Sequence, residues 1–487
     1  MQRRIVIPFA ALSLLAGCLL FVSQPFLQTI VTFTGHLLNK NLNFHFWKTG
    51  LERMGVELIL LSANILLSIF FYKINPNRFI YFSCLSWIVV FIIYVIKDSV
   101  NIPNADDYGL FLEFLNKYSS DHDLSPIYSQ VTESRMVIMH ILGIVLFYLH
   151  AFDFRILTLF SVACLIGIAI LLYKSILLQE KALLLLLIVI LIFQFQYYNA
   201  VLLPSDALYS TCTVFYVFAS MYLLNKNSTR MFLFASTWFL IAVLNCGSGF
   251  TAFISGFVLL LSQKRSKHLV WWILFSSITF SIYFYNYSFE NGNHISSAGF
   301  NAITHQVFRC IIFSFAFLGS PFQFLYQTTL PIIAGGITWF YFLFLTSKKY
   351  YKQNPVVYVM LLFAIQTSIL PALMRPDYSL DADISIRYGI YSITAICCCI
   401  IALFETSAIA NNKKLIFTLC VFSTAYHLST NIFFYPEVVV RKEKLETFIK
   451  QIRAGISSPT LPLYAPDNAE AIIKESVRKN IYTIPDK

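Results

Sequence analysis

The stretch FIYFSCLSWIVVFIIYVI, residues 79–96, decides the fold class of this chain. It runs for 18 residues without a charged side chain, and a helix needs about 20 mostly apolar residues to cross a hydrocarbon core of about 30 Å. Comparable apolar runs lie at residues 5–20, 182–195 and 415–425. None of them alternates between polar and apolar side chains as the strands of a membrane barrel do. The sequence therefore predicts an all-α, polytopic transmembrane helical protein.

The composition of the whole chain agrees with that prediction. Of its 487 residues, 58% are hydrophobic and 12% are charged, against about 25% charged residues in ordinary soluble proteins. The net charge is +11, but the basic residues are spread over short loops, for example at residues 73–78, 264–267 and 348–352. Basic loops mark the cytoplasmic side of a membrane protein. The positive charge therefore indicates orientation in a lipid bilayer, and we expect no nucleic-acid partner.

The same rule predicts a topology. Arg3 and Arg4 precede the first apolar run and no small-residue cleavage site follows it, so we expect a retained first helix with a cytoplasmic N-terminus. The following crossings place the polar loop 98–135 on the external side. We expect about 11–13 spans within a membrane domain of residues 1–435. Residues 436–487 then form a short external C-terminal tail.

Two regions do not fit a simple alternation of crossings. A full span over residues 311–325 would put the basic residues 348–352 outside, so a re-entrant or interfacial helix is expected there. Between residues 136 and 206, the apolar segments cannot all be full spans and still leave every basic loop on the cytoplasmic side. Short or half-crossing helices there would remove this conflict. In the tail, a helical pattern over residues 441–453 ends before Gly455, and Asn468 is placed to cap a second helix.

Cysteine and histidine spacing shows no metal-binding pattern. Almost all of the ten cysteines lie in apolar runs, Cys397–Cys399 among them, without the paired spacing of a zinc site. His294 and His305 are single residues in a loop. The sequence therefore predicts no cofactor and does not indicate a divalent metal.

Acidic residues concentrate in the loop 98–135. Of the 24 Asp and Glu residues of the chain, it holds Asp98, Asp106, Asp107, Glu113, Asp121, Asp123 and Glu133. Adjacent carboxylates raise one another's pKa, so the pair Asp106–Asp107 is costly to keep ionised. A carboxylate held near a reacting oxygen serves as a general base or a cation ligand. The alternative is that these acids solvate the loop and cap a helix over residues 108–117, whose apolar positions 111, 112, 114 and 115 form one face.

With this topology, the segment 101–135 resembles the GT-C superfamily of polytopic glycosyltransferases, which take sugars from polyprenyl-phosphate carriers. Their hallmark is an acidic pair at the start of the first large external loop, where this chain has Asp106–Asp107. Glu133, Ser134 and Arg135 correspond to the G/S-R position that precedes the next helix in several bacterial branches. The size and loop layout look most like the bacterial and phage glucosyltransferases that modify O-antigen.

The resemblance implies a hexosyltransferase of the bacterial inner membrane with a periplasmic active site. Its donor would be a polyprenyl-phosphate sugar, expected to be a glucosyl donor, and its acceptor an envelope glycan such as O-antigen. Asp106 or Asp107 would act as the general base. The residues expected to contact the substrates are Glu133, Arg135, Asp206, Asp383 and Arg387, with Arg375 as a further cation.

Several of these residues have simpler interpretations. Arg387 follows Asp383 at the start of an apolar run and could be an interfacial anchor whose charge reaches the headgroups. Asp206, in the turn Leu203–Asp206, lines the same cavity if that turn is external and is a helix cap if it is cytoplasmic. Arg375 follows Pro371 in a loop, where a structural role is the alternative.

Two other functions compete with glycosyl transfer. A transporter or flippase of lipid-linked sugars would place ionisable residues near the middle of its spans. The sequence-based topology puts Glu57 and Glu405 near helix ends instead, which favours external chemistry. An O-antigen polymerase would be expected to have Arg-rich external loops, whereas the external loops here hold more acid than base.

Overall fold

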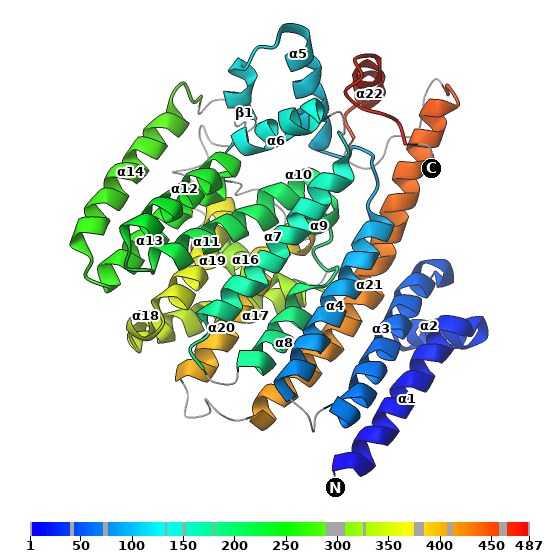
Figure 1. Ribbon diagram of the computed structural model, residues 1–487. Helices are drawn as coiled ribbons and strands as arrows, with labels where there is room; N and C mark the ends of the chain where they lie inside the picture. The colour runs from blue at the N-terminus through cyan, green and yellow to red at the C-terminus, as the bar shows by residue number, and fades with distance from the viewer. Residues whose placement is uncertain are drawn as a thin grey trace. The chain divides into compact units, whose positions relative to one another are not determined.

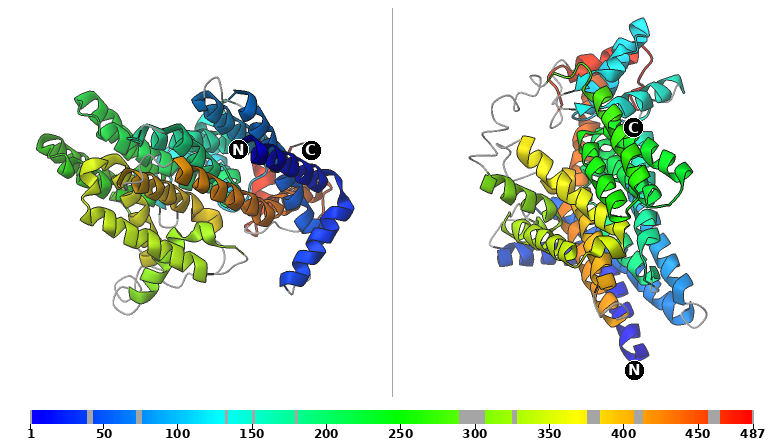
Figure 2. Two further views of the ribbon diagram at one scale, coloured as in Figure 1. Left: turned by 90° about the horizontal axis from the view of Figure 1, so that it is seen from below. Right: turned by 90° about the vertical axis from the view of Figure 1, so that its left-hand side faces the viewer.

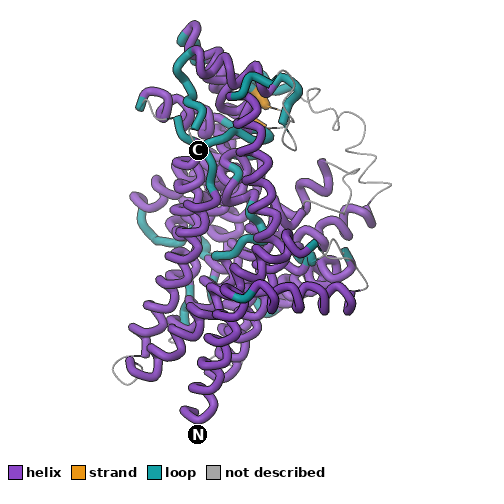
Figure 3. Tube along the Cα trace, turned by 90° about the vertical axis from the view of Figure 1, so that its right-hand side faces the viewer, coloured by secondary structure: helices purple, strands orange, loops and turns teal. Residues whose placement is uncertain are grey.

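The computed structural model describes residues 2–38, 43–71, 76–131, 134–149, 152–178, 181–288, 307–324, 328–374, 384–406, 413–456 and 465–485. Most of these residues are helical (Figure 1). The strands in these ranges are β1 (Gln130–Val131) and β2 (Ser134–Arg135), a short antiparallel pair (Figure 3). The all-α prediction is therefore confirmed for the described chain.

Unit 1, the first of two compact units, comprises Met1–Asp98, Gln179–Tyr198 and Asn411–Lys444. Its helices are α1 (Gln2–Val22), α2 (Gln24–Leu38), α3 (Phe44–Phe71), α4 (Pro76–Asp98), α8 (Lys181–Ile192) and most of α21 (Lys413–Arg453).

Glycines set the closest helix contact of unit 1. A side chain on Gly17 of α1 would meet the carbonyl oxygen of Gly55 of α3 at 2.7 Å, and one on Gly55 would meet that of Gly17 at 2.9 Å. Small residues at a crossing let two helix backbones touch, as in many helix pairs within bilayers. α2 leaves α1 at an angle of 98° (Figure 2), so the pair forms a broken span or a re-entrant turn.

Unit 2 comprises Ser99–Leu178, Asn199–Ala410 and Leu445–Lys487. Its helices up to residue 262 are η1 (Tyr108–Glu113), α5 (Phe114–Asp121), η2 (Ser125–Tyr128), α6 (Val137–Tyr148), α7 (Phe154–Ser175), α9 (Asn199–Leu202), α10 (Pro204–Ala207), η3 (Leu208–Cys212), α11 (Thr213–Leu224), α12 (Thr229–Asn245), η4 (Gly247–Phe250) and α13 (Thr251–Ser262). The remaining ones are α14 (Ser266–Phe284), α16 (Val307–Leu318), η5 (Ser320–Phe322), α17 (Thr329–Ser347), α18 (Tyr350–Gln353), α19 (Pro355–Met374), α20 (Ile384–Thr406) and α22 (Ala469–Arg478).

Two helices form the centre of unit 2. One is the continuous apolar helix Pro204–Leu224, made of α10, η3 and α11, and the other is α20. Of the most apolar stretch of each helix, 78% is buried in the first and 72% in the second. Their N-terminal turns carry Asp206 and Arg387. The best-buried helices of this unit therefore begin with charged residues, and those residues belong to the candidate site.

In the described part of the chain, six helices are long and apolar enough to cross a membrane: Asn77–Asp98, Phe154–Ser175, Pro204–Leu224, Thr329–Ser347, Arg387–Thr406 and Lys414–Arg453. The bent pair α1–α2 would make a seventh. Other apolar runs form shorter helices; α6 and α16, at 12 residues each, extend only about 18 Å. The described residues therefore provide six or seven candidate spans and not the expected 11–13. The short α6 and α16 agree with the expectation of short helices between residues 136 and 206 and of a helix that does not span the membrane at residues 311–325.

The expectation that Glu57 lies near a helix end is wrong. α3 has 28 residues and begins at Phe44, so Glu57 lies near its middle. The charged residues in its first half form i,i+4 pairs along the helix: Lys48 with Glu52 at 3.6 Å and Arg53 with Glu57 at 2.8 Å.

The expected boundary at residues 435 and 436 falls within α21. That helix continues to Arg453 with Pro436 inside it, although an internal proline removes one backbone hydrogen bond. Its predicted end is confirmed. Gly455 has a φ of +67°, and Ile456 N donates to Gln451 O at 3.2 Å, a glycine-terminated helix end.

The second predicted tail helix is also present, as α22. Its expected cap is not: the Asn468 side chain makes no capping bond and donates to Glu113 Oε1 at 3.4 Å. Lys479 Nζ donates to the carbonyl of Asn116 at 2.6 Å, and Tyr482 Oη donates to that of Asn101 at 2.6 Å. The C-terminal segment therefore packs on the acidic loop within unit 2.

Candidate functional site

The acidic pair sits on a tight turn. Asp107 N donates to Asn104 O at 3.0 Å and closes the turn, and Ala105 within it has a φ of +49°. A residue with a side chain is uncommon in this left-handed region because its Cβ crowds the backbone. The turn places Asp106 and Asp107 in different surroundings, one exposed and one fully buried.

Asp107 is bound to two backbone amides. Its Oδ2 accepts from Asn104 N at 3.0 Å and its Oδ1 accepts from Ser205 N at 2.9 Å. Ser205 belongs to the first turn of the helix Pro204–Leu224, where unpaired N–H groups favour a negative charge. Asp107 thus caps a helix far away in the sequence, and does not cap the helix that follows it.

Asp106 faces outward and pairs with an arginine. Its Oδ2 lies 3.2 Å from Arg387 Nη2, and the same nitrogen lies 2.9 Å from Asp206 Oδ1. The Asp106 side chain is 56% exposed, whereas that of Asp206 is 5% exposed. The arginine therefore bridges a buried carboxylate and an accessible one, and its Nε has no hydrogen-bond partner in the described part of the chain.

These contacts bring together four of the predicted site residues: Asp106, Asp107, Asp206 and Arg387. The geometry agrees with the interpretation of Asp206 as part of the same site as the acidic pair. The predicted apolar face behind the pair is also present, since residues 111, 112, 114 and 115 are buried. Burial, with the neighbouring Asp107 carboxylate, raises the pKa of the Tyr108 hydroxyl well above its usual value, so this phenol stays neutral.

Arg135 is not part of this cluster. Its two Nη atoms donate to the backbone carbonyls of Tyr128 and Tyr285, the latter at 2.6 Å, and its guanidinium lies 4.2 Å from the centre of the Tyr128 ring. One N–H of each terminal nitrogen is thus bonded to a loop carbonyl. Its place in the structure is that of a loop anchor.

The remaining predicted residues lie outside the described part of the chain. They are Glu133, Asp383, Arg375, His294 and His305. Among the residues that are described, no three His, Cys, Asp or Glu side chains come together as metal ligands.

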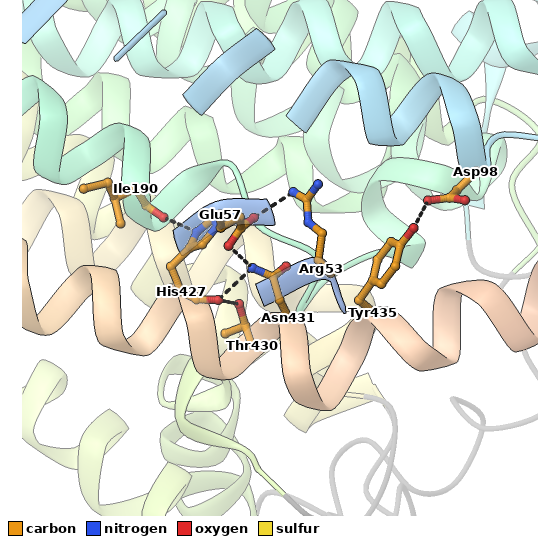
Figure 4. Close-up of polar contacts among 8 residues, drawn as sticks. All are labelled: Arg53, Glu57, Asp98, Ile190, His427, Thr430, Asn431 and Tyr435. Atoms are coloured by element: carbon orange, nitrogen blue, oxygen red, sulfur yellow. Dashed lines mark hydrogen bonds and ion pairs between the residues drawn. The ribbon is translucent and has the colours of Figure 1, made fainter. Parts of the chain in front are cut away.

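A second polar cluster, in unit 1, was missed by the sequence analysis (Figure 4). Glu57 on α3 accepts from Arg53 Nη2 at 2.8 Å and Asn431 Nδ2 at 2.5 Å, and its Oε1 lies 3.1 Å from His427 Nε2. All four side chains are at most 2% exposed. The available signals were an Arg-x-x-x-Glu pair at helical spacing and a histidine within the apolar run that begins at residue 415.

Comparisons of this chain with protein-family models, with curated proteins and with solved structures find no match.

Proposed function

We propose that this protein is a membrane glycosyltransferase that moves a sugar, of which glucosyl is our first choice, from a polyprenyl-phosphate donor to an envelope glycan. The observation that carries the proposal is the exposed Asp106 carboxylate, held by Arg387 at the N-terminal ends of two apolar helices. The resemblance of residues 101–135 to the GT-C superfamily supplies the reaction class. We place the site on the periplasmic face of a bacterial inner membrane.

In the proposed reaction Asp106 is the general base. It takes the proton of the acceptor hydroxyl while the oxygen forms a bond to the anomeric carbon of the sugar. The bond between that carbon and the phosphate oxygen breaks, and polyprenyl phosphate leaves with the electron pair. The transition state resembles an oxocarbenium ion, so base and leaving group lie on opposite faces of the sugar.

Asp106 suits this role better than Asp107. A base needs an oxygen that can reach the acceptor. Among the described residues, the exposed Asp106 carboxylate pairs with Arg387 through a single oxygen, Oδ2. Both oxygens of Asp107 accept backbone N–H groups in the interior of unit 2. We therefore assign Asp107 to positioning the loop.

Arg387 is the proposed contact for the donor phosphate. A guanidinium carries five N–H donors and remains charged at any working pH. Asp106 and Asp206 engage one of its nitrogens, Nη2. Asp206 fixes the guanidinium from the buried side and leaves other donors for a phosphate.

Substitution of Asp106 tests the proposal. We expect Asp106→Asn to reduce sugar transfer onto envelope glycan in cells by about 10²- to 10⁴-fold, the usual contribution of a general base. Protein abundance in the membrane should not change, because the side chain is exposed. Asp123→Asn, an exposed acid of the same loop, is the matched control and should keep full transfer. Full transfer by Asp106→Asn at normal abundance would refute the assignment.

One observation favours a second candidate, a transporter or flippase of lipid-linked sugars. The argument that acids avoid the middle of the helices does not hold for Glu57, which lies near the centre of α3 with Arg53 and His427. Ionisable residues at such depth are typical of transport pathways. Transport without transfer would show as movement of a lipid-linked sugar across proteoliposomes, unaffected by Asp106→Asn.

A further inference from the structure

His427 is held at both ring nitrogens. Nδ1 lies 2.9 Å from the carbonyl oxygen of Ile190, and Nε2 lies 3.1 Å from Glu57 Oε1 (Figure 4). A carbonyl oxygen only accepts hydrogen bonds, so Nδ1 carries a hydrogen. The contact at Nε2 is a hydrogen bond only if one more proton lies on Nε2 or on Glu57.

Two arrangements of that proton satisfy the contact. In one, an imidazolium donates to the Glu57 carboxylate; in the other, a protonated Glu57 donates to a neutral imidazole. The two arrangements contain the same number of protons. If the proton leaves, the Nε2 lone pair of His427 faces a carboxylate oxygen across 3.1 Å, and the contact becomes repulsive.

The other hydrogen bonds of Glu57 come from groups that keep their protons. Arg53 Nη2 donates to Oε1, and Asn431 Nδ2 donates to Oε2. A guanidinium is not deprotonated in proteins, and an amide is not an acid at working pH. The proton between Glu57 and His427 is therefore the exchangeable one within this cluster.

The surroundings of the pair contain few other titratable groups. α1 has no Asp, Glu, His, Lys or Arg between residues 5 and 22, and α8 contributes the Ile190 carbonyl. Among the described residues, the charged, titratable or aromatic groups near the pair include Arg53 on α3, Trp87, Tyr94 and Asp98 on α4, Phe195, and Tyr435 on α21, with Lys97 against the Tyr94 ring. Asp98 accepts a hydrogen bond from Tyr435 Oη at 2.9 Å, so this acid is paired with a phenol on α21 and not with His427.

We propose that Glu57 and His427 form a proton-binding site in the interior of unit 1, and that its single proton holds α3 and α21 together. Water supplies the proton on binding and receives it on release. Release leaves two facing acceptors on different helices, which favours their separation. This inference does not depend on the glycosyltransferase proposal, because it involves none of the residues assigned to that reaction.

The direct test is ¹⁵N NMR of the histidine side chains in the full-length protein in lipid nanodiscs, titrated from about pH 5 to about pH 9. His427 is the only histidine that directly follows a tyrosine, so labelling tyrosine and histidine together identifies its signal without any substitution. We expect a proton-bearing or strongly hydrogen-bonded Nε2 at the acid end and its loss at the alkaline end. A neutral His427 beside an ionised Glu57 over the whole range would overturn the proposal.

A thermal-unfolding profile against pH gives the second readout. We expect the midpoint of unit 1 to fall as the pH rises and the proton leaves. Glu57→Gln should remove this dependence, because an amide neither binds nor releases a proton in this pH range. Glu52→Gln on the same helix is the matched control, because its side chain is 34% exposed in the pair with Lys48, and it should keep the wild-type profile. Identical profiles for wild type and Glu57→Gln would reject the site even if both proteins are fully folded.

Discussion

The two ionic clusters of this protein differ in how much of their hydrogen-bonding capacity is open. In unit 2, the Asp106 side chain is 56% exposed and one of its oxygens pairs with Arg387. In unit 1, the Glu57 side chain has no exposed surface and both of its oxygens are bonded to side chains. The first arrangement can meet a substrate, whereas the second can exchange only a proton.

The comparison shows that an acid in a membrane protein is not informative by its residue type alone. A buried carboxylate needs partners, because an unpaired charge in an apolar interior is very costly. Asp107 and Glu57 both satisfy this requirement, with backbone amides in one case and with Arg53, His427 and Asn431 in the other. The Asp106 carboxylate is exposed to solvent and does not need to be fully paired, so it can bind a substrate hydroxyl and is the candidate base.

The largest effect is expected from breaking the closed cluster. Arg53→Ala removes the permanent cation from the buried Glu57 side chain and should destabilise unit 1 by about 3–5 kcal/mol. The double variant Arg53→Met with Glu57→Gln removes both charges and should cost much less. Thermal or denaturant unfolding in detergent measures both.

The matched control lies on the same helix. Lys48 pairs with Glu52 at the same i,i+4 spacing, but their side chains are 25% and 34% exposed. Lys48→Ala should therefore change stability by no more than about 0.5 kcal/mol. If Arg53→Ala and Lys48→Ala lower the stability equally little, the buried Arg53–Glu57 pair contributes no more than an exposed ion pair, and the argument from its burial is wrong.

A smaller effect separates the two adjacent aspartates. Asp107→Asn places an amide N–H against one of two backbone donors, which should cost about 1–3 kcal/mol. Asp106→Asn should cost about 0.5 kcal/mol or less, as expected for an exposed ion pair. Unfolding of the two purified variants under the same conditions measures the difference. Equal losses would contradict the division into a base and a positioning residue.

Much of the fold could be predicted from apolar runs and their boundaries. The helix over residues 79–96, the helix end at Gly455 and the buried face at 111–115 are present because each follows from local sequence. The central position of Glu57 in α3 was not predicted, because charged residues indicate the end of an apolar helix when their partners are unknown. Arg53 and Glu57 satisfy each other one turn apart, which keeps them inside the helix.

The candidate site was predictable in part. The acidic pair and Arg387 could be identified from sequence, because charges beside apolar runs are rare. The different surroundings of Asp106 and Asp107 could not, since they depend on Ser205, which lies far away along the chain. His427 was missed for the same reason, because its partner Glu57 lies in another helix distant in sequence.

The smallest expected effect concerns Asp123, an exposed acid in the same loop as Asp106 that is already hydrogen-bonded. Its Oδ2 accepts from Ser125 Oγ at 2.5 Å and its Oδ1 accepts from Ser125 N at 2.8 Å. The bond from the Ser125 side chain, followed by that from its backbone, lowers the pKa of Asp123. A lowered folded-state pKa stabilises the fold above the unfolded value of about 3.9, and this contribution disappears as the pH falls through the folded-state pKa.

Ser125→Ala removes the side-chain hydrogen bond, which lowers the Asp123 pKa more than the backbone bond does. The Asp123 pKa should therefore rise toward its ordinary value. The ¹³C shift of the Asp123 carboxyl, followed between about pH 2 and about pH 6, measures it. Because Asp123 is fully solvated, sugar transfer and overall stability near neutral pH should hardly change. An unchanged pKa would mean that the bonds to Ser125 do not persist in solution. Asp123 would then be as open as Asp106, and an open carboxylate in this loop would no longer distinguish the candidate base.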